Sequence, residues 1–142
     1  MLYDPVLVQP MREELTRLGF RQLLDASQVD EALGPDSGTV LLVVNSVCGC
    51  AARNARPAVA LSAGHSNQPD DKVTVFAGQD TEATAHARRF LTGYRPSSPS
   101  IALLRDGEPV FMLERHQIEG RSAEAIATDI GAAFDRFCTV DA

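Results

Sequence analysis

The sequence predicts an α/β protein with a central mixed sheet flanked by helices on both faces. Apolar stretches of strand length alternate along the chain with stretches of helical periodicity. The stretch Gly38–Ser46 is apolar throughout its core, which is typical of a parallel strand buried on both faces. Farther on, Asp106 and Gly107 separate two apolar runs, as in an antiparallel hairpin. We expect a single domain over residues 1–142, with about four or five strands, because no linker or change of composition divides the chain.

The N-terminal part of the chain is expected to hold two helices and a short strand. Apolar residues at helical spacing predict a first helix that ends before Gly19, and Pro10 leaves its first residue open. These apolar residues are Leu7, Met11, Leu15 and Leu18. A short strand at Arg21–Leu24 and a small helix led by Ser27 follow.

The rest of the chain continues the alternation. A helix from Cys50 to Ala63 should kink at Pro57, which has no N–H to donate. Asp80 is expected to cap a helix that reaches Leu91. The other expected elements are, in order, a strand at Lys72–Ala77, hairpin strands at Ile101–Leu104 and Val110–Leu113, and a last helix from about Ser122 with Ile126, Ile130, Phe134 and Phe137 on one stripe.

Composition and charge narrow the range of partners. The formal net charge is −6 at pH 7, so we expect neither a nucleic acid nor an anionic membrane as a partner. No apolar run approaches the ~20 residues that span a bilayer, and the N-terminus lacks the basic and apolar regions of a secretory leader. Three cysteines are too few for a secreted disulfide scaffold. We therefore expect a soluble protein of the reducing cytoplasm.

Two thiols one residue apart, Cys48 and Cys50, mark the candidate site. They follow the predicted buried strand at the point where a helix begins, and the free backbone N–H groups and positive dipole end of a helix stabilise a thiolate there. A zinc site needs about four ligands. The other candidate ligands show no recognisable metal-ligand spacing, and they are His65, His86, His116 and Cys138. The pattern predicts thiol–disulfide exchange, without a metal or cofactor.

The two thiols are expected to have different roles. Cys48 precedes the helix and should be the more exposed and more acidic thiol, so it is the expected nucleophile. Cys50 is expected to resolve the mixed disulfide that forms. A disulfide between them closes a ring of about eleven atoms, so we expect it to be strained and easily reduced. Cys138 ends an amphipathic helix and is expected to be a buried apolar residue.

Five stretches, taken together and in this order, cover essentially the whole chain and carry a family resemblance. They are Val44–Pro57, Val75–Asp80, Pro96–Ser100, Glu114–Gly120 and Ala132–Cys138. The chain resembles the bacilliredoxin family, thioredoxin-like proteins with a Cys-Gly-Cys site. The resemblance implies a thioredoxin-like fold. It also implies an enzyme that removes bacillithiol, a low-molecular-weight thiol, from mixed disulfides on client proteins, or a weak disulfide isomerase. The family carries a cysteine at the place of Cys138, which keeps an accessory redox role open for it.

Four further residues are candidates for substrate binding. In a thioredoxin-like domain the proline before the final hairpin is typically cis and faces the dithiol, with the preceding backbone free to pair with an incoming chain. The resemblance therefore implies a cis bond between Ser98 and Pro99, although composition alone favours trans. Arg53 and Arg56 follow the thiols and are candidates to lower the thiolate pKa and to orient the carboxylates of bacillithiol. Two arginines on an exposed helix face also fit a merely solvated surface.

A second class of function stays open for the same dithiol. A non-catalytic redox sensor or a metal-binding adaptor would use the two cysteines without turnover. A sensor changes state once, whereas an oxidoreductase cycles with a reductant, so turnover distinguishes the two classes.

Overall fold

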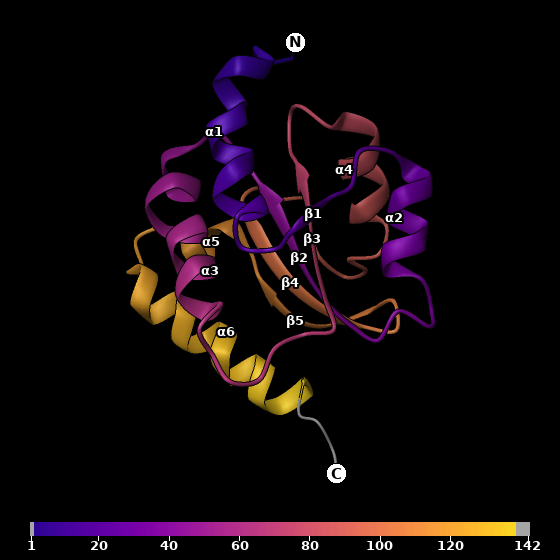
Figure 1. Ribbon diagram of the computed structural model, residues 1–142, viewed down its shortest axis with the longest axis vertical. Coiled ribbons are helices and arrows are strands. Elements are labelled where there is room, and N and C mark those ends of the chain that lie inside the picture. Colours follow the sequence, from indigo (N-terminus) through magenta and orange to yellow (C-terminus); the bar gives the residue numbers. More distant parts are fainter. Residues whose placement is uncertain (1, 139–142) are drawn as a thin grey trace.

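The computed structural model describes residues 2–138 and shows one mixed sheet of five strands (Figure 1). The strands are β1 (Arg21–Gln22), β2 (Thr39–Asn45), β3 (Asp71–Phe76), β4 (Ser100–Arg105) and β5 (Glu108–Leu113). Their order in the sheet is β1-β3-β2-β4-β5, with β1 and β2 parallel to β3 and with β4 antiparallel to β2 and β5. The expected single domain extends to residue 1 and residues 139–142, which lie outside the described residues, and it stays a prediction.

Helices cover both faces of this sheet (Figure 1). They are α1 (Pro5–Thr16), α2 (Ala26–Leu33), α3 (Arg56–Ser62), α4 (Thr81–Arg88), α5 (Arg115–Ile118) and α6 (Ala123–Phe137), with a π-helical segment, η1 (Ala51–Ala55), directly before α3. One face is covered by α2 and α4, and the other by α1, α3 and α6. The predicted α/β class is therefore confirmed. Among residues 2–138, no helix is long and apolar enough to cross a membrane.

The central strand β2 supplies side chains to two hydrophobic cores. Leu41 and Val43 point to the core under α1, α3 and α6, whereas Val40, Leu42 and Val44 point to the core under α2 and α4. All seven residues of the strand are buried. Burial on both faces, predicted from the continuous apolar run, is confirmed. The strand is thereby fixed within the sheet, and the two cysteines follow its carboxyl end.

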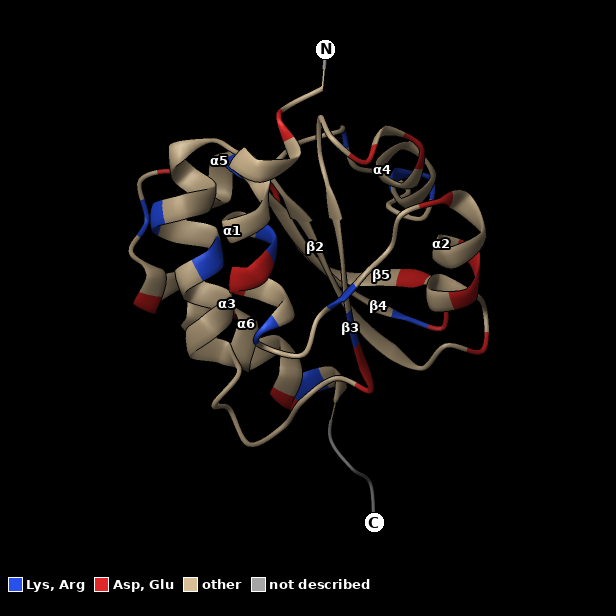
Figure 2. Ribbon diagram, turned by 45° about the horizontal axis from the view of Figure 1, so that its top comes forward, with Lys and Arg blue, Asp and Glu red and all other residues tan. Residues whose placement is uncertain are grey.

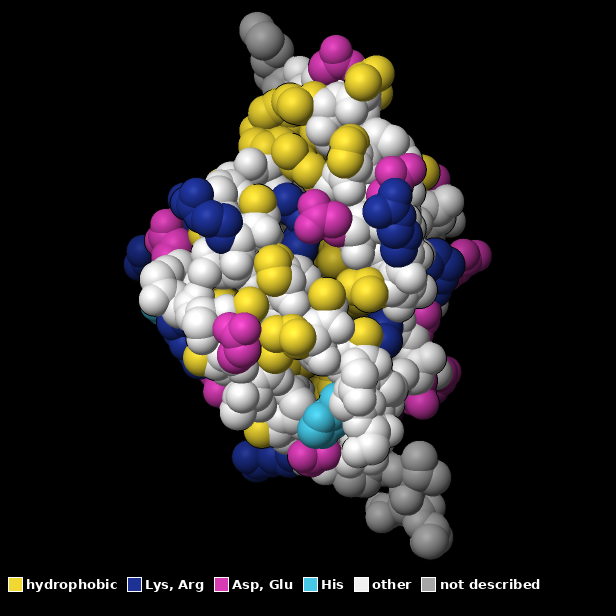
Figure 3. Space-filling view, turned by 60° about the vertical axis from the view of Figure 1, so that its left-hand side comes forward, with side chains coloured by type: hydrophobic (Ala, Val, Ile, Leu, Met, Phe, Trp, Pro, Cys, Tyr) yellow, Lys and Arg dark blue, Asp and Glu magenta, His cyan; other side chains and the backbone are white. Residues whose placement is uncertain are grey.

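The first helix, predicted from apolar residues at helical spacing, is present as α1. Of those residues, Leu15 is buried and Leu18 packs against the core, whereas Leu7 is 53% exposed and the neighbouring Val8 is buried. Figure 3 shows hydrophobic side chains gathered near the N-terminal end of the molecule. The exposed large apolar residues in this part of the chain are Leu2, Tyr3, Val6 and Leu7.

Most other element boundaries follow from local chemistry. The hairpin is confirmed, and its turn residues Asp106 and Gly107 have φ angles of 50° and 85°, in the left-handed region that such turns require. Ser122 caps α6 by accepting a hydrogen bond from the Ala125 N–H. The helix α2 is capped by Asp25 and not led by Ser27. The four-residue helix α5 was not expected.

Candidate active site

The two thiols lie where β2 ends and a helix begins, as predicted. The carbonyl of Cys48 accepts hydrogen bonds from the N–H groups of Ala51 at 3.0 Å and Ala52 at 3.2 Å, so helical hydrogen bonding starts at this cysteine. Cys48 is half-buried, whereas Cys50 is buried. Both thiols are free, and their sulfurs are 2.7 Å apart. Cys48 is thus the thiol that solvent reaches, with Cys50 directly behind it.

The surroundings move the pKa values of these thiols in opposite directions. Partial burial by itself raises the pKa of Cys48, but hydrogen bonds from the Cys50 thiol and the Ser46 hydroxyl oppose it. Together with the backbone N–H groups of residues 50 and 51, they lower the pKa of Cys48 below its ordinary value. Burial raises the pKa of Cys50, and the neighbouring Cys48 sulfur raises it further. As pH rises, Cys48 is the first of the pair to become a thiolate.

Ser46 belongs to the site, although the sequence analysis did not single it out. Its Oγ accepts a hydrogen bond from the Cys48 N–H at 3.1 Å. Its hydroxyl also forms a hydrogen bond with the Cys48 sulfur. Its own N–H donates to Asn45 Oδ1 at 2.9 Å. A serine whose hydroxyl bonds the N–H two residues on is a known local turn pattern, so the serine two positions before Cys48 was a usable signal.

The helix after the thiols is interrupted near Pro57, where a kink was expected. The N–H of Arg56 bonds to the carbonyl of Ala51, five residues back, which is the hydrogen-bond step of a π-helix. The α-helix then starts anew at Arg56, and Pro57 lies in its first turn, where a missing N–H costs nothing. The wider turn changes which way the residues that follow it face.

Arg56 is only 3% exposed, so the expectation that it lies on an exposed helix face is wrong. Its Nη1 donates to Asn45 Oδ1 and to the Ser46 carbonyl, both at 2.9 Å. Its Nε lies 3.1 Å from Glu14 Oε2. The guanidinium therefore ties the end of β2 to α1 and to the helix after the thiols. We assign Arg56 this supporting role in place of the expected contact with substrate.

Arg53 is exposed, as expected, and its guanidinium lies against the glycine between the two thiols. A Cβ on Gly49 would lie 2.8 Å from Nη2 and 3.2 Å from Cζ of Arg53, so the absence of a side chain leaves room for the guanidinium. Figure 2 shows basic residues interspersed with acidic ones on the helices. Because charges of both signs are mixed on the helices, the positive charge beside the dithiol comes from individual arginines, and Arg53 is one of them.

The loop before β4 reaches the same end of the sheet as the dithiol. The peptide bond between Ser98 and Pro99 is cis, which confirms the expectation. Ser100 pairs with Val44 in the antiparallel register of β4 and β2. Because the two strands run in opposite directions, residues 98 and 99 continue past Ser100 alongside the last residues of β2. Pro99 is buried, whereas Ser98 is half-buried.

Arg115 is hydrogen-bonded to this loop and was missed by the sequence analysis. Its backbone N–H donates to Ser97 Oγ at 3.4 Å, and its Nη1 donates to the Ser98 carbonyl at 3.5 Å. The negative charges of Cys50 and then Cys48 are the main causes that raise the pKa of this guanidinium. Arg115 in turn opposes the larger effect of burial on the pKa of Cys50. No local sequence signal places residue 115 beside residue 98.

Cys138 lies at the opposite end of β2 from the dithiol. Its side chain is buried and hydrogen-bonded to Thr39, the first residue of the strand, whereas Cys48 follows the last. Seven strand residues span about 23 Å. Burial raises the pKa of Cys138. The expected burial is confirmed. Because the length of β2 lies between Cys138 and the dithiol, Cys138 does not exchange directly with Cys48 or Cys50.

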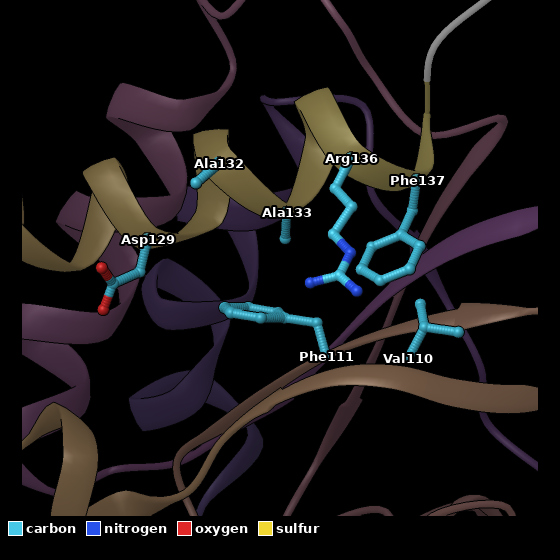
Figure 4. Close-up of a pocket in the computed structure, with 7 residues that line it drawn as sticks. All are labelled: Val110, Phe111, Asp129, Ala132, Ala133, Arg136 and Phe137. Atoms are coloured by element: carbon cyan, nitrogen blue, oxygen red, sulfur yellow. The ribbon is translucent and has the colours of Figure 1, made fainter.

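Two surface hollows lie along α6, and neither contains the dithiol. One, of about 370 Å³, lies between α6 and β5 and is lined by Val110, Phe111, Asp129, Ala132, Ala133, Arg136 and Phe137. Figure 4 shows the Arg136 side chain extending from α6 toward β5. The other, of about 440 Å³, lies beside His65 and Asp135. Within residues 2–138, no three His, Cys, Asp or Glu side chains come together as metal ligands.

Comparison with known proteins covers nearly the whole chain. Residues 3–138 match the family described as disulphide isomerase. A bacilliredoxin of Salinibacter ruber is 52% identical over 97% of this chain and 82% of its own length. A bacilliredoxin of Koribacter versatilis is 48% identical over 96% of this chain and 94% of its own. One of Halalkalibacterium halodurans is 51% identical over 94% of this chain and 91% of its own.

Solved structures share the fold at low sequence identity. A thioredoxin of Malassezia sympodialis has a TM-score of 0.55 and 15% identity, over 84% of this chain and 91% of that one. A mutant thioredoxin of Halobacterium salinarum has a TM-score of 0.54 and 20% identity, over 85% of this chain and 92% of that one. These likenesses show a thioredoxin-like fold. With the family match and the relatives at about half identity, they establish that the chain belongs to the bacilliredoxin family.

Proposed function

We propose that the protein is a thiol–disulfide oxidoreductase that removes bacillithiol from mixed disulfides on client proteins in the cytoplasm. The carrying observation is a pair of thiols 2.7 Å apart, with the pKa lowered for the accessible Cys48 and raised for the buried Cys50. A lowered pKa supplies the attacking thiolate, and a raised pKa keeps the second thiol protonated until it is needed. The naming of the relatives as bacilliredoxins supports bacillithiol as the thiol removed.

In the first step the Cys48 thiolate attacks the bacillithiol sulfur of the client mixed disulfide. The bond between client and bacillithiol breaks, and the client cysteine leaves as a thiolate that takes a proton from water. A disulfide between Cys48 and bacillithiol forms, so this exchange needs no outside electrons. Before the attack, the helix-terminal N–H groups and the Ser46 hydroxyl stabilise the thiolate.

In the second step Cys50 attacks the Cys48 sulfur, and bacillithiol leaves as a thiol. Once Cys48 is in a disulfide, its negative charge is gone, and the charge and hydrogen bond that raised the pKa of Cys50 disappear. Cys50 therefore becomes more acidic when it must act. The products are a client thiol, bacillithiol and an oxidised Cys48–Cys50 pair. An external dithiol reductant supplies the two electrons and two protons that restore the site.

The test compares wild type with cysteine variants on a bacillithiol-modified client, followed by mass spectrometry. Wild type should release bacillithiol repeatedly when a dithiol reductant is present. Cys50→Ser should accumulate a Cys48–bacillithiol adduct, and Cys48→Ser should be inert. Cys138→Ser is the matched control and should cycle like wild type. Equal, uncatalysed release by all four proteins would favour the redox sensor or metal-binding adaptor. Activity confined to scrambled protein disulfides would favour a weak disulfide isomerase.

A further inference from the structure

Arg115 lies at the site with only weak partners of its own. Its guanidinium is exposed, and its ion pair with Glu119 is a single contact of 3.4 Å between Nη2 and Oε2. Its bond to the Ser98 carbonyl is 3.5 Å long. Contacts of this length between exposed groups hold a guanidinium weakly. Arg115 can therefore exchange Glu119 for a carboxylate that arrives from solvent.

The backbone of Arg115 is held at the end of β4 that lies beside the end of β2. Its N–H donates to Ser97 Oγ, in the loop that continues into β4 beside the end of β2. The negative charges of Cys50 and Cys48 act on the guanidinium and raise its pKa. A small molecule whose sulfur is bonded to Cys48 therefore lies at the same end of the sheet as Arg115.

We propose that Arg115 binds a carboxylate of the low-molecular-weight thiol in the mixed disulfide, and thereby favours acidic thiols as the group that Cys48 accepts. The inference rests on the proposed function and deepens it. The planar fork of a guanidinium matches a carboxylate with two parallel hydrogen bonds. Glu119, at the C-terminal cap of α5, is the carboxylate that pairs with this guanidinium in the structure. Arg53, against Gly49, is a second positive charge beside the same thiols.

Alternatively, Arg115 could affect only the reactivity of the thiols, without contacting the substrate. Arg115 lowers the pKa of Cys50 against the effect of burial, so its loss would change thiol chemistry with every substrate. Recognition of a carboxylate predicts a loss confined to substrates that carry one. Selectivity between two substrates therefore separates recognition from a general effect on reactivity.

The experiment uses the full chain with Cys50→Ser, so that adducts on Cys48 are not resolved. The second-order rate of adduct formation is measured with 3,3′-dithiodipropionate, which carries carboxylates, and with 2-hydroxyethyl disulfide, which is neutral. Arg115→Gln should reduce the rate ratio of the acidic to the neutral disulfide about tenfold, as for the loss of one charge-assisted contact. Arg115→Lys should restore part of that ratio. Arg17→Gln is the matched control, because Arg17 forms an equally long i,i+4 pair with Glu13 at 3.4 Å.

Two outcomes overturn the inference while leaving the proposed function in place. In one, Arg115→Gln slows both disulfides equally, and in the other it slows neither. If Cys48 reacts with neither disulfide before Arg115 is changed, the assignment of Cys48 as nucleophile fails, and the inference about Arg115 fails with it.

Discussion

The Cys48 sulfur lies 2.7 Å from the Cys50 sulfur, and part of the difference between their pKa values arises from this contact. The Cys50 thiol donates to the Cys48 thiolate, which lowers the pKa of Cys48. The same charge and hydrogen bond raise the pKa of Cys50, beyond the effect of its burial. The pair therefore holds one negative charge in preference to two, and it holds that charge on Cys48.

Alkylation of the reduced protein should label Cys48 before the other thiols. The pKa of Cys48 is lowered, whereas burial raises the pKa values of Cys50 and Cys138, so Cys48 ionises first as pH rises from mildly acidic values. Iodoacetamide labelling at a series of pH values, read by peptide mass spectrometry, measures the three rates. Faster labelling of Cys138 would contradict the assignment of the nucleophile.

Ser46→Ala should make Cys48 less acidic. The substitution removes a hydroxyl that helps to lower the pKa of Cys48, so its alkylation profile should move to higher pH. At mildly acidic pH the variant should react more slowly than wild type. Ser66→Ala, in an exposed loop, is the control and should leave the profile in place. An identical profile for Ser46→Ala would remove Ser46 from the site.

Arg56→Met should destabilise the fold much more than Arg53→Met. Removing the buried guanidinium removes the hydrogen bonds that it donates to the Ser46 carbonyl and to Asn45 Oδ1. This loss should lower the free energy of unfolding by about 2 kcal/mol. Arg53 is exposed three residues earlier, and its loss should change that free energy by less than about 0.5 kcal/mol. Urea unfolding of both variants measures the difference. Equal stability of the two variants would contradict the supporting role of Arg56.

Gly49→Ala should displace Arg53 without unfolding the protein. The new methyl group would lie 2.8 Å from Arg53 Nη2, and the flexible guanidinium would have to move aside. If Arg53 assists the reaction of Cys48 with an acidic disulfide from its place beside Gly49, Gly49→Ala already removes that assistance. Adding Arg53→Gln to Gly49→Ala should then have little further effect on the rate of this reaction. A double-mutant cycle on that rate measures the coupling. Simple additivity would show that this placement has no bearing on the reaction.

The parts of the fold set by local pattern could be predicted from the sequence. The continuous apolar run of β2, the Asp106–Gly107 turn and the start of the last helix at Ser122 each depend on a few neighbouring residues, and the structure has all three. The position of Cys48 at the end of β2 follows from the first of these. The face of α1 was harder, because apolar residues occur all along that segment and the core selects Val8 over Leu7.

The residues that depend on distant packing could not be predicted in the same way. The sequence analysis took Arg53 and Arg56 together as arginines of an exposed helix face, whereas the wider turn of η1 changes the direction in which the next residues face, and Arg56 is buried. Arg115 becomes a neighbour of Ser98 only when α5 meets the loop before β4. Both positions are set by tertiary contacts, which the residues around them in the sequence do not specify.

The burial of Cys138 beside Thr39 gives the molecule a thiol whose labelling measures conformational opening. In the native state a bulky thiol reagent must wait until the end of α6 separates from β2, so the rate of labelling reflects how often this region opens. Labelling of Cys48 depends instead on its ionisation. One time course with a coloured thiol reagent thus yields a fast phase for the reactive site and a slow phase for local unfolding. Substitutions in the core should change the slow phase, and substitutions at Ser46 should change the fast one.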